Sequence, residues 1–191
     1  MLQDLVRKNR SCRRFFQDAH IDVETLRQLV DLGRLSASGR NRQPLKYILS
    51  NEAPRNELVF PHLGWAAELP DWDGPEEGER PSAYVVILGD REIHPSSGCD
   101  ECIAAQSILL GATERGWAGC MIRSIARNDL RSALGIPERY DIRLVLALGK
   151  PKESVVIDPL GSDGDTRYWR DENDVHHVPK RSLNEVILEQ W

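Results

Sequence analysis

A short basic stretch near the N-terminus is the part of the sequence best suited to chemistry. The cations are Arg7, Lys8, Arg10, Arg13 and Arg14, five in eight positions with no acid among them. Guanidinium groups donate paired, charge-assisted hydrogen bonds to a phosphate, and the Ser11 hydroxyl can serve a remaining acceptor. A run of this kind can also form the solvated face of a helix. The residue types alone leave both interpretations open.

The overall composition is that of an ordinary globular protein. The chain has 191 residues, 40% apolar and 29% charged, with a formal net charge of −5. This acidic balance disfavours nucleic-acid binding, which needs a broad cationic surface. No apolar run approaches the roughly 20 residues that span a bilayer, and the first residues lack a signal-peptide pattern. We therefore expect a cytoplasmic protein that binds neither nucleic acid nor membrane.

The four cysteines, Cys12, Cys99, Cys102 and Cys120, fit free thiols in a reducing compartment. Cys99 and Cys102 form a C-D-E-C motif at the expected start of a helix, where thiols can be reactive. The simpler interpretation is that they are small buried apolar residues. Zinc would need two further ligands, and the nearest pair, His176 and His177, is adjacent rather than at ligand spacing. The sequence therefore predicts no metal site.

Hydrophobic patterns indicate the elements that must position these residues. Residues 23–36 predict a helix with Asp22 as N-cap and a hydrophobic staple between Ile21 and Leu26. Runs rich in β-formers at residues 45–50, 83–89 and 142–149 predict strands of one sheet.

Two further helices are expected. Residues 100–115 are apolar nearly all round and stop at Gly116, which is typical of a helix buried on most sides or shared with another subunit. A shorter helix is expected from a cap at Asn128 to a stop at Gly135.

The order of the elements favours a mixed α+β layer architecture, with residues 1–191 forming a single domain. No G-x-G-x-x-G motif follows a strand, so a Rossmann fold is disfavoured. Between the first two strands lies a long loop whose Trp65 and Trp72 either roof a pocket or anchor the loop by packing. Residues 150–191 show little periodicity and are expected to be an extended C-terminal arm that lies over something else.

Four blocks in sequence carry a family resemblance. They are NRSCRRF from residue 9, SASGRNRQPLKYIL from residue 36, CIAAQSILLGATERGWAGCMI from residue 102 and LGIPERYDIRLVLALGKPKE from residue 134. Their order and spacing resemble the nitroreductase family of FMN-dependent oxidoreductases over residues 5 to 152. The resemblance implies a nitroreductase-like sheet flanked by helices, a central buried helix and a C-terminal arm exchanged in a dimer.

The resemblance also implies which residues hold the phosphate end of FMN. These are Arg10, Ser11, Arg13, Lys180 and Arg181. The family's first arginine is Asn9 here, an amide without charge, and Arg14 is a candidate to replace the lost cation. Lys180 and Arg181 stand where relatives bring a basic pair to the same phosphate, and exposed arm charges are the alternative.

The ring end of FMN is assigned in the same way. Its residues are Ser38, Asn41, Gln43, Arg123 and Ser124. The first three match a family loop that reaches the flavin from the other subunit, where amides suit the ring's alternating acceptors and donors; a polar turn that caps the preceding helix is the alternative. A backbone amide of Arg123 or Ser124 near the ring would stabilise charge on the reduced flavin. No side chain stands out as a catalytic acid or base.

The function implied by the resemblance is an FMN-dependent oxidoreductase that works as a homodimer with FMN at the interface. NAD(P)H or another donor would supply two electrons, and a small organic acceptor would take them in ping-pong fashion. The acceptor need not be a nitro compound, since a dehalogenase or a dehydrogenase of the same family fits equally. A non-catalytic flavin-binding redox sensor or FMN carrier is the alternative from another class. An RNA-binding module that uses the basic stretch ranks last.

Overall fold

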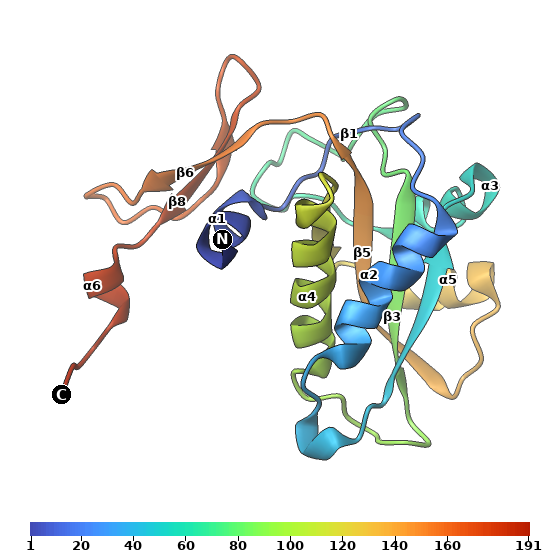
Figure 1. Cartoon of the computed structure of the whole chain (residues 1–191). Coiled ribbons are helices and arrows are strands. Elements are labelled where there is room, and N and C mark those ends of the chain that lie inside the picture. The colour runs from blue at the N-terminus through green and yellow to red at the C-terminus, as the bar shows by residue number, and fades with distance from the viewer.

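The computed structural model describes all 191 residues, and an antiparallel sheet lies at its centre (Figure 1). The strands of this sheet are β1 (Phe15–Phe16), β2 (Leu45–Ser50), β3 (Ala83–Asp90), β4 (Ala118–Ile122) and β5 (Tyr140–Pro151). Their order is β1-β5-β3-β2, and β4 also pairs with β5. The three predicted strands are confirmed as β2, β3 and β5, and β1 and β4 complete the sheet. The architecture is the predicted mixed α+β class.

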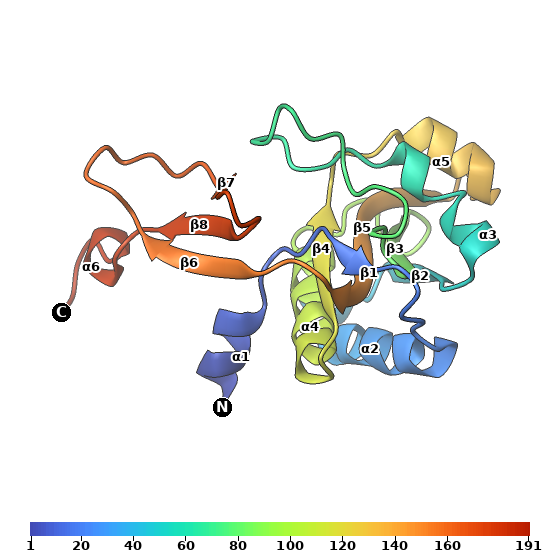
Figure 2. The ribbon, with the colours of Figure 1, turned by 90° about the horizontal axis from the view of Figure 1, so that it is seen from above.

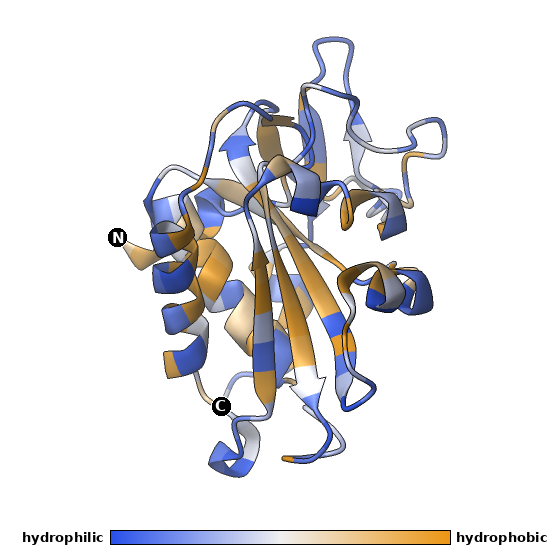
Figure 3. Cartoon of the chain, turned by 90° about the vertical axis from the view of Figure 1, so that its right-hand side faces the viewer, coloured by the Kyte–Doolittle hydropathy of each residue, from blue (hydrophilic) through white to orange (hydrophobic).

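Both faces of the sheet are covered, which is why β3 is buried along its whole length. Its alternate side chains Ala83, Val85 and Ile87 enter one apolar cluster, and Tyr84, Val86 and Leu88 enter another. The helices are α2 (Val23–Leu35) and α4 (Asp100–Glu114) on one face and α5 (Arg127–Leu134) on the other. Figure 2 shows this division, and Figure 3 shows the apolar strands between the layers.

The ends of the helices confirm some sequence signals and correct one. Asp22 Oδ1 accepts a hydrogen bond of 2.7 Å from the backbone N–H of Thr25, as its predicted role as N-cap requires. Gly135 ends α5 in the left-handed conformation (φ 64°), as predicted. The predicted cap at Asn128 is wrong, because α5 begins at Arg127 and Ala126 is its N-cap. Asn128 therefore lies in the first turn of the helix.

Helix α4 is buried along most of its length, as predicted. Ala105 and Ile108 pack toward the sheet and α2, and Ala104 faces Gly33 of α2. The remaining face of α4 is open, because Ile103 is 40% exposed and the neighbouring Cys102 is exposed as well.

The N-terminal helix and the C-terminal arm lie on the same side of the main body (Figures 1 and 2). The elements are α1 (Leu2–Lys8), β6 (Val155–Pro159), β7 (Trp169–Arg170), β8 (His176–Lys180) and α6 (Leu183–Val186). The three strands form a second sheet of order β6-β8-β7, with β6 and β8 parallel. No pattern in the sequence predicts this sheet, because its strands are short and polar contacts hold them together. His177 Nδ1, for example, lies 2.7 Å from Asp158 Oδ2 and its ring stacks on Trp169.

The long connection between β2 and β3 contains only short helical pieces. They are α3 (Ala53–Asn56) and the 3-10 turn η2 (Phe60–His62); a similar turn, η1 (Gly39–Asn41), precedes β2. None of the helices has the length and apolar character required to cross a membrane.

Candidate functional site

The basic stretch begins with Arg7 and Lys8 in the last turn of α1 and continues as an extended segment along the edge of the sheet. Ser11 forms a parallel bridge with Gly119 of β4, and the backbone N–H of Cys12 donates a 3.0 Å hydrogen bond to the Gly119 carbonyl. Glycine is needed at position 119 for the close approach of β4 to β5, because a Cβ there would lie 2.6 Å from the Ala147 carbonyl oxygen. The strand pairing therefore fixes where Arg10, Ser11 and Arg13 leave the backbone.

Two donors at the start of this segment are buried without a partner. They are Asn9 Nδ2 and Arg10 Nε. Arg10 also donates from Nη2 to the Val6 carbonyl at 2.8 Å, and burial lowers the pKa of its guanidinium. A buried donor that makes no hydrogen bond is costly, so these two atoms suit an acceptor-rich ligand.

Residues of the C-terminal arm contact both the backbone and the side chain of Arg13. Its backbone N–H donates to Glu153 Oε1, and its guanidinium lies 4.9 Å from the centre of the Tyr168 ring. The side chain of Glu153 is fully buried and also pairs with Arg170 at 3.1 Å. The Arg13 guanidinium itself forms no ion pair with an acid, so its charge is available.

Arg14 is not available to replace the cation lost at Asn9. Its Nε and Nη2 donate to Glu79 at 2.5 and 2.9 Å, and its Nη1 lies 3.2 Å from Asp174. The hydrogen bonds to Arg14 hold the pKa of Glu79 at about 2, and the same pairing raises the pKa of Arg14. Arg14 is a structural link between the long loop and the arm.

Arg123 and Ser124 lie just beyond the end of β4, on the same edge of the sheet as Ser11. The register places Ser11 beside Gly119, four residues before Arg123, which is about 13 Å at about 3.3 Å per strand residue. Both side chains are exposed. The Ser124 carbonyl accepts a 2.8 Å hydrogen bond from Gly64 N–H, so the long loop closes against this turn.

The two tryptophans of the long loop serve its packing. Trp65 lies against Phe60, with ring centres 5.9 Å apart, and Trp72 lies 4.3 Å from the guanidinium of Arg170. Trp72 thus connects the loop to the arm. These contacts favour packing anchors over a pocket roof.

A compact loop at the N-terminal end of α4 contains Ser38, Asn41 and Gln43. Ser38 Oγ donates to Asp100 Oδ2 at 2.6 Å and accepts from Gln43 N–H at 2.8 Å. Gln43 Nε2 donates to Asn41 Oδ1 at 3.1 Å. Asn41 and Gln43 are exposed and both have positive φ. The side-chain amides of Asn41 and Gln43 are therefore exposed, while the hydrogen bonds of Ser38 fix the backbone of the loop.

Within one chain the structure does not bring the predicted residues together. Arg10 shares a cavity of about 330 Å³ with Thr113 and Gly116, at the C-terminal end of α4, whereas Ser38 contacts Asp100 at its N-terminal end. The helix has 15 residues and is about 22 Å long at about 1.5 Å per residue. One mononucleotide can touch both groups only if the loop comes from a second chain.

Lys180 and Arg181 also lie apart from Arg10. They line a separate cavity of about 300 Å³ in the arm, and Arg181 Nη1 lies 3.5 Å from Glu185 Oε1. Both side chains are exposed. Their predicted contact with the same phosphate stays a prediction.

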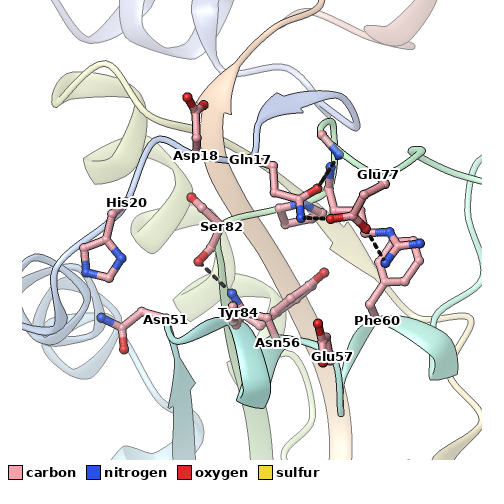
Figure 4. A pocket seen from close by; sticks show the side chains of 14 residues that line it. Gln17, Asp18, His20, Asn51, Asn56, Glu57, Phe60, Glu77, Ser82 and Tyr84 are labelled. Atoms are coloured by element: carbon pink, nitrogen blue, oxygen red, sulfur yellow. Dashed lines mark hydrogen bonds and ion pairs between the residues drawn. The ribbon is translucent and has the colours of Figure 1, made fainter.

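A further cavity, of about 610 Å³, contains none of the predicted residues (Figure 4). His20 and Asn51 lie on one side of it, and Phe60, with the Arg80 guanidinium 4.3 Å from its ring centre, lies on the other. Ser82 Oγ is buried in its wall without a partner. No motif in the sequence marks this cavity, because its residues come from three separate segments, 17–20, 51–60 and 77–84.

The cysteines divide into two pairs. Cys12 and Cys120 are buried beside the basic segment, and burial raises the pKa of both thiols. Cys99 and Cys102 are exposed, so the interpretation of this pair as buried apolar residues is wrong. No group of three or more His, Cys, Asp or Glu side chains is arranged to hold a metal ion.

Comparison with other sequences identifies the family of the chain. The sequence profile of the nitroreductase family matches residues 6–77 and 78–150. The match covers most of the chain, which therefore belongs to the nitroreductase family.

Individual relatives are distant in sequence. A protein of Archaeoglobus fulgidus with the provisional name NADH dehydrogenase/NAD(P)H nitroreductase is 27% identical over 148 residues, which are 73% of this chain and 80% of the relative. The crystal structure of a nitroreductase-like protein of Streptococcus mutans is 15% identical, with a TM-score of 0.71 over 100% of both chains. A provisionally named nitroreductase of Desulfovibrio desulfuricans, solved in complex with FMN, is 21% identical, with a TM-score of 0.70 over 100% of this chain and 96% of its own. These structures share the fold.

Proposed function

We propose that this protein is an FMN-dependent oxidoreductase that transfers two electrons from NAD(P)H or another donor to a small organic acceptor. The proposal rests on two arginines on either side of Ser11, Arg10 and Arg13, which form no ion pair with an acid. Arg10 has a buried Nε without a partner, and Arg13 has no acid partner, whereas the neighbouring Arg14 is fully engaged. Donors left unpaired at one sheet edge suit the dianionic phosphate of a mononucleotide.

The remaining residues fit the same cofactor. Arg10, Ser11 and Arg13 would hold the phosphate, and the backbone of Arg123 and Ser124 would lie along the ring. FMN, when bound, supplies the acceptance and release of two electrons. The chain's own residues bind the phosphate, orient the ring and keep it against β4. The FMN complexes of the Exiguobacterium sibiricum and Desulfovibrio desulfuricans relatives and the name of the Archaeoglobus fulgidus relative support this assignment.

A homodimer would complete each site. Asn41 and Gln43 are too far from Arg10 in one chain and would contact the ring from the partner subunit, while Lys180 and Arg181 would reach the phosphate through the arm. Exposed apolar side chains at both termini support such a partner. They are Met1, Leu2, Val6, Leu183, Val186, Ile187, Leu188 and Trp191. Large apolar side chains left in water at both ends of a chain favour a protein–protein contact.

FMN binding tests the proposal directly. The apoprotein is titrated with FMN, and quenching of flavin fluorescence gives the Kd. Arg13→Ala removes a charge-assisted hydrogen bond of about 1.5–3 kcal/mol, so we expect the Kd to rise about 10- to 100-fold. Arg27→Ala, an exposed arginine of α2, is the matched control and should leave the Kd unchanged. Protein that is colourless after incubation with excess FMN and removal of the free FMN by desalting would contradict the proposal.

Mixing two variants tests the shared site. Neither Arg13→Ala nor Gln43→Ala homodimers hold an intact site. A heterodimer of the two holds one intact site if the site takes Arg13 from one chain and Gln43 from the other. We expect tight binding to return to about half of the sites in the heterodimers. Sites built within one chain would stay weak in every combination.

Anaerobic reduction separates the enzyme from a carrier. The bound flavin is mixed with NADH, NADPH and other donors, and its absorbance is followed before and after an acceptor is added. Reduction by a donor and reoxidation by an organic acceptor support the oxidoreductase. FMN that stays oxidised with every donor favours a redox sensor or carrier.

A further inference from the structure

Cys99 and Cys102 are three residues apart at the start of α4. The backbone N–H of Cys102 donates a 3.0 Å hydrogen bond to the Cys99 carbonyl and so closes a turn between them. A closed turn holds Cα atoms three residues apart within about 7 Å, which overlaps the range of about 4.4–6.8 Å that disulfides span. Both cysteines are free and exposed. Cys99 is the N-cap of α4 but makes no side-chain capping bond, so its thiol is uncommitted.

Cys99 lies in the wall of an open cavity of about 690 Å³. Arg40 and Arg42 line the same cavity, and both are exposed. The one acid in the lining is Asp100, which is buried with its carboxylate accepting hydrogen bonds from Ser38 Oγ and the Gly39 N–H. The cavity therefore presents net positive charge to a ligand that approaches Cys99.

The thiols of Cys12 and Cys120 differ from this pair in exposure and in hydrogen bonding. Cys12 and Cys120 are buried, and Cys12 Sγ donates to the Arg14 carbonyl at 3.3 Å. Burial raises the pKa of both thiols, which disfavours the thiolate. They provide internal controls within the same chain.

We propose that Cys99 and Cys102 are a thiol–disulfide exchange site for small disulfides that carry carboxylates. Arg40 and Arg42 attract the carboxylates, and Cys99, which faces the cavity, is the first thiol to react. This activity is separate from the flavin chemistry proposed above and does not rest on it.

The exchange balances with the disulfide as the oxidant. The Cys99 thiolate attacks one sulfur of R–S–S–R, which forms a mixed disulfide and releases the first R–S⁻ to take a proton. The Cys102 thiolate then attacks Cys99 Sγ, which closes the Cys99–Cys102 disulfide and releases the second thiol. The protein pair loses two electrons and two protons, and R–S–S–R becomes two R–SH.

The site is also coupled to the loop at residues 38–43. Asp100 lies between the cysteines and holds Ser38 and Gly39, and Arg40, Asn41 and Gln43 in this loop have positive φ. A left-handed backbone at three non-glycine residues depends on such cross-links. Closure of the disulfide should therefore change the exposure of the loop.

The test uses the full-length protein, with any bound FMN, first reduced and then freed of reductant. It is incubated with oxidised glutathione, quenched with acid, unfolded, alkylated and analysed by peptide mass spectrometry. We expect the peptide with Cys99 and Cys102 to become lighter by two hydrogen atoms and to escape alkylation, while Cys12 and Cys120 remain alkylated. Cys102→Ser should accumulate one glutathione on Cys99. Oxidation of the buried pair instead, or alkylation of all four cysteines after prolonged incubation, would overturn the proposal.

Charge variants test the class of disulfide. Oxidised glutathione should react about tenfold faster than the cationic disulfide cystamine at low salt, and Arg42→Glu should remove this preference. Arg27→Glu makes the same charge change on α2, away from the cavity, and should retain the preference. Equal rates for the two disulfides with the wild-type protein would overturn the assignment to anionic substrates. Loss of FMN binding in the tests above leaves these outcomes unaffected, so the two proposals fail separately.

Discussion

The central sheet and the C-terminal arm bury different kinds of side chain. Val85, Val86 and Leu146 of the sheet are fully buried among apolar neighbours, whereas Glu153 and His176 are the buried anchors of the arm. Apolar burial is non-directional and independent of pH, but buried charges and hydrogen bonds depend on geometry and on protonation. The chain therefore joins a platform, which consists of the central sheet with α2, α4 and α5, to an arm whose stability depends on geometry and pH. Arg13 lies where the two meet.

The largest expected effect comes from the platform. Leu146→Ala leaves a cavity between β5 and the helices α2 and α4, and such changes cost about 2–5 kcal/mol. We expect the free energy of unfolding, measured with urea, to fall by about 3 kcal/mol. Leu35→Ala is the control, because that side chain is 65% exposed and its loss should change stability little. Equal effects of the two variants would mean that apolar burial at Leu146 does not stabilise the central sheet.

A smaller and local effect is expected from the arm. Glu153→Gln keeps an oxygen for the backbone N–H groups of Arg13 and Arg14 but removes the charge that pairs with Arg170. Hydrogen bonds to charged groups are worth about 2 kcal/mol, so the arm should open about 30-fold more often. Hydrogen exchange measured by mass spectrometry should accelerate in residues 152–180 and stay unchanged in β3.

The control for this variant is Glu189→Gln, at an exposed position near the C-terminus. It makes the same charge change without a buried partner and should leave exchange in the arm unaltered. Faster exchange throughout the sheet of Glu153→Gln would mean that the arm and the platform form one cooperative unit.

The stability of the arm should depend on pH in two opposite ways. Hydrogen bonding to Asp158, and also to Asp171, raises the pKa of His177 above its usual 6.5, so the folded arm binds its proton more tightly. That contribution is complete below pH 6.5 and is lost as the pH rises through the raised pKa. Burial lowers the pKa of the adjacent His176 to about 4, so its contribution is complete above pH 6.5 and is lost as the pH falls toward 4.

We therefore expect arm opening to be least frequent near pH 6.5. Hydrogen exchange of the β6 and β8 amides, corrected for the intrinsic pH dependence of exchange, measures this optimum. His177→Gln should remove the alkaline limb and leave the acid limb, because burial, the main cause of the low pKa of His176, remains; of the charged neighbours, Arg13 and Arg170 act in the same direction and Glu153 opposes them. A pH profile that His177→Gln does not change would show that the ion pair with Asp158 contributes nothing.

The same difference explains what the sequence could predict. The strands β2, β3 and β5 and the helices α2 and α4 carry continuous apolar patterns, and these were predicted correctly. The strands of the arm carry no such pattern, because contacts such as that of His177 with Asp158 join residues 19 positions apart. Only the folded chain brings them together.

The residues of the candidate site also differ in whether the sequence could predict them. Arg10, Ser11 and Arg13 are contiguous, so a motif was enough to select them. Glu153 and Tyr168, which position Arg13, come from the arm, and no local signal marks them. Arg14 has the same side chain as Arg13, and only the contact with Glu79 shows that it is engaged.

The smallest expected effect compares two helix starts of the platform that looked alike in sequence. Asp22 accepts from Thr25 N–H and Thr25 Oγ1, and these hydrogen bonds lower its pKa, so Asp22→Ala should cost about 1 kcal/mol. Asn128 caps nothing and lies inside the first turn of α5, where alanine has the higher helix propensity, so Asn128→Ala should be neutral or stabilise slightly. Urea unfolding of the two variants measures the difference. Equal costs would mean that Asn128 satisfies a helix N–H in solution after all, and that the cap expected from the sequence describes α5 better than Ala126 does.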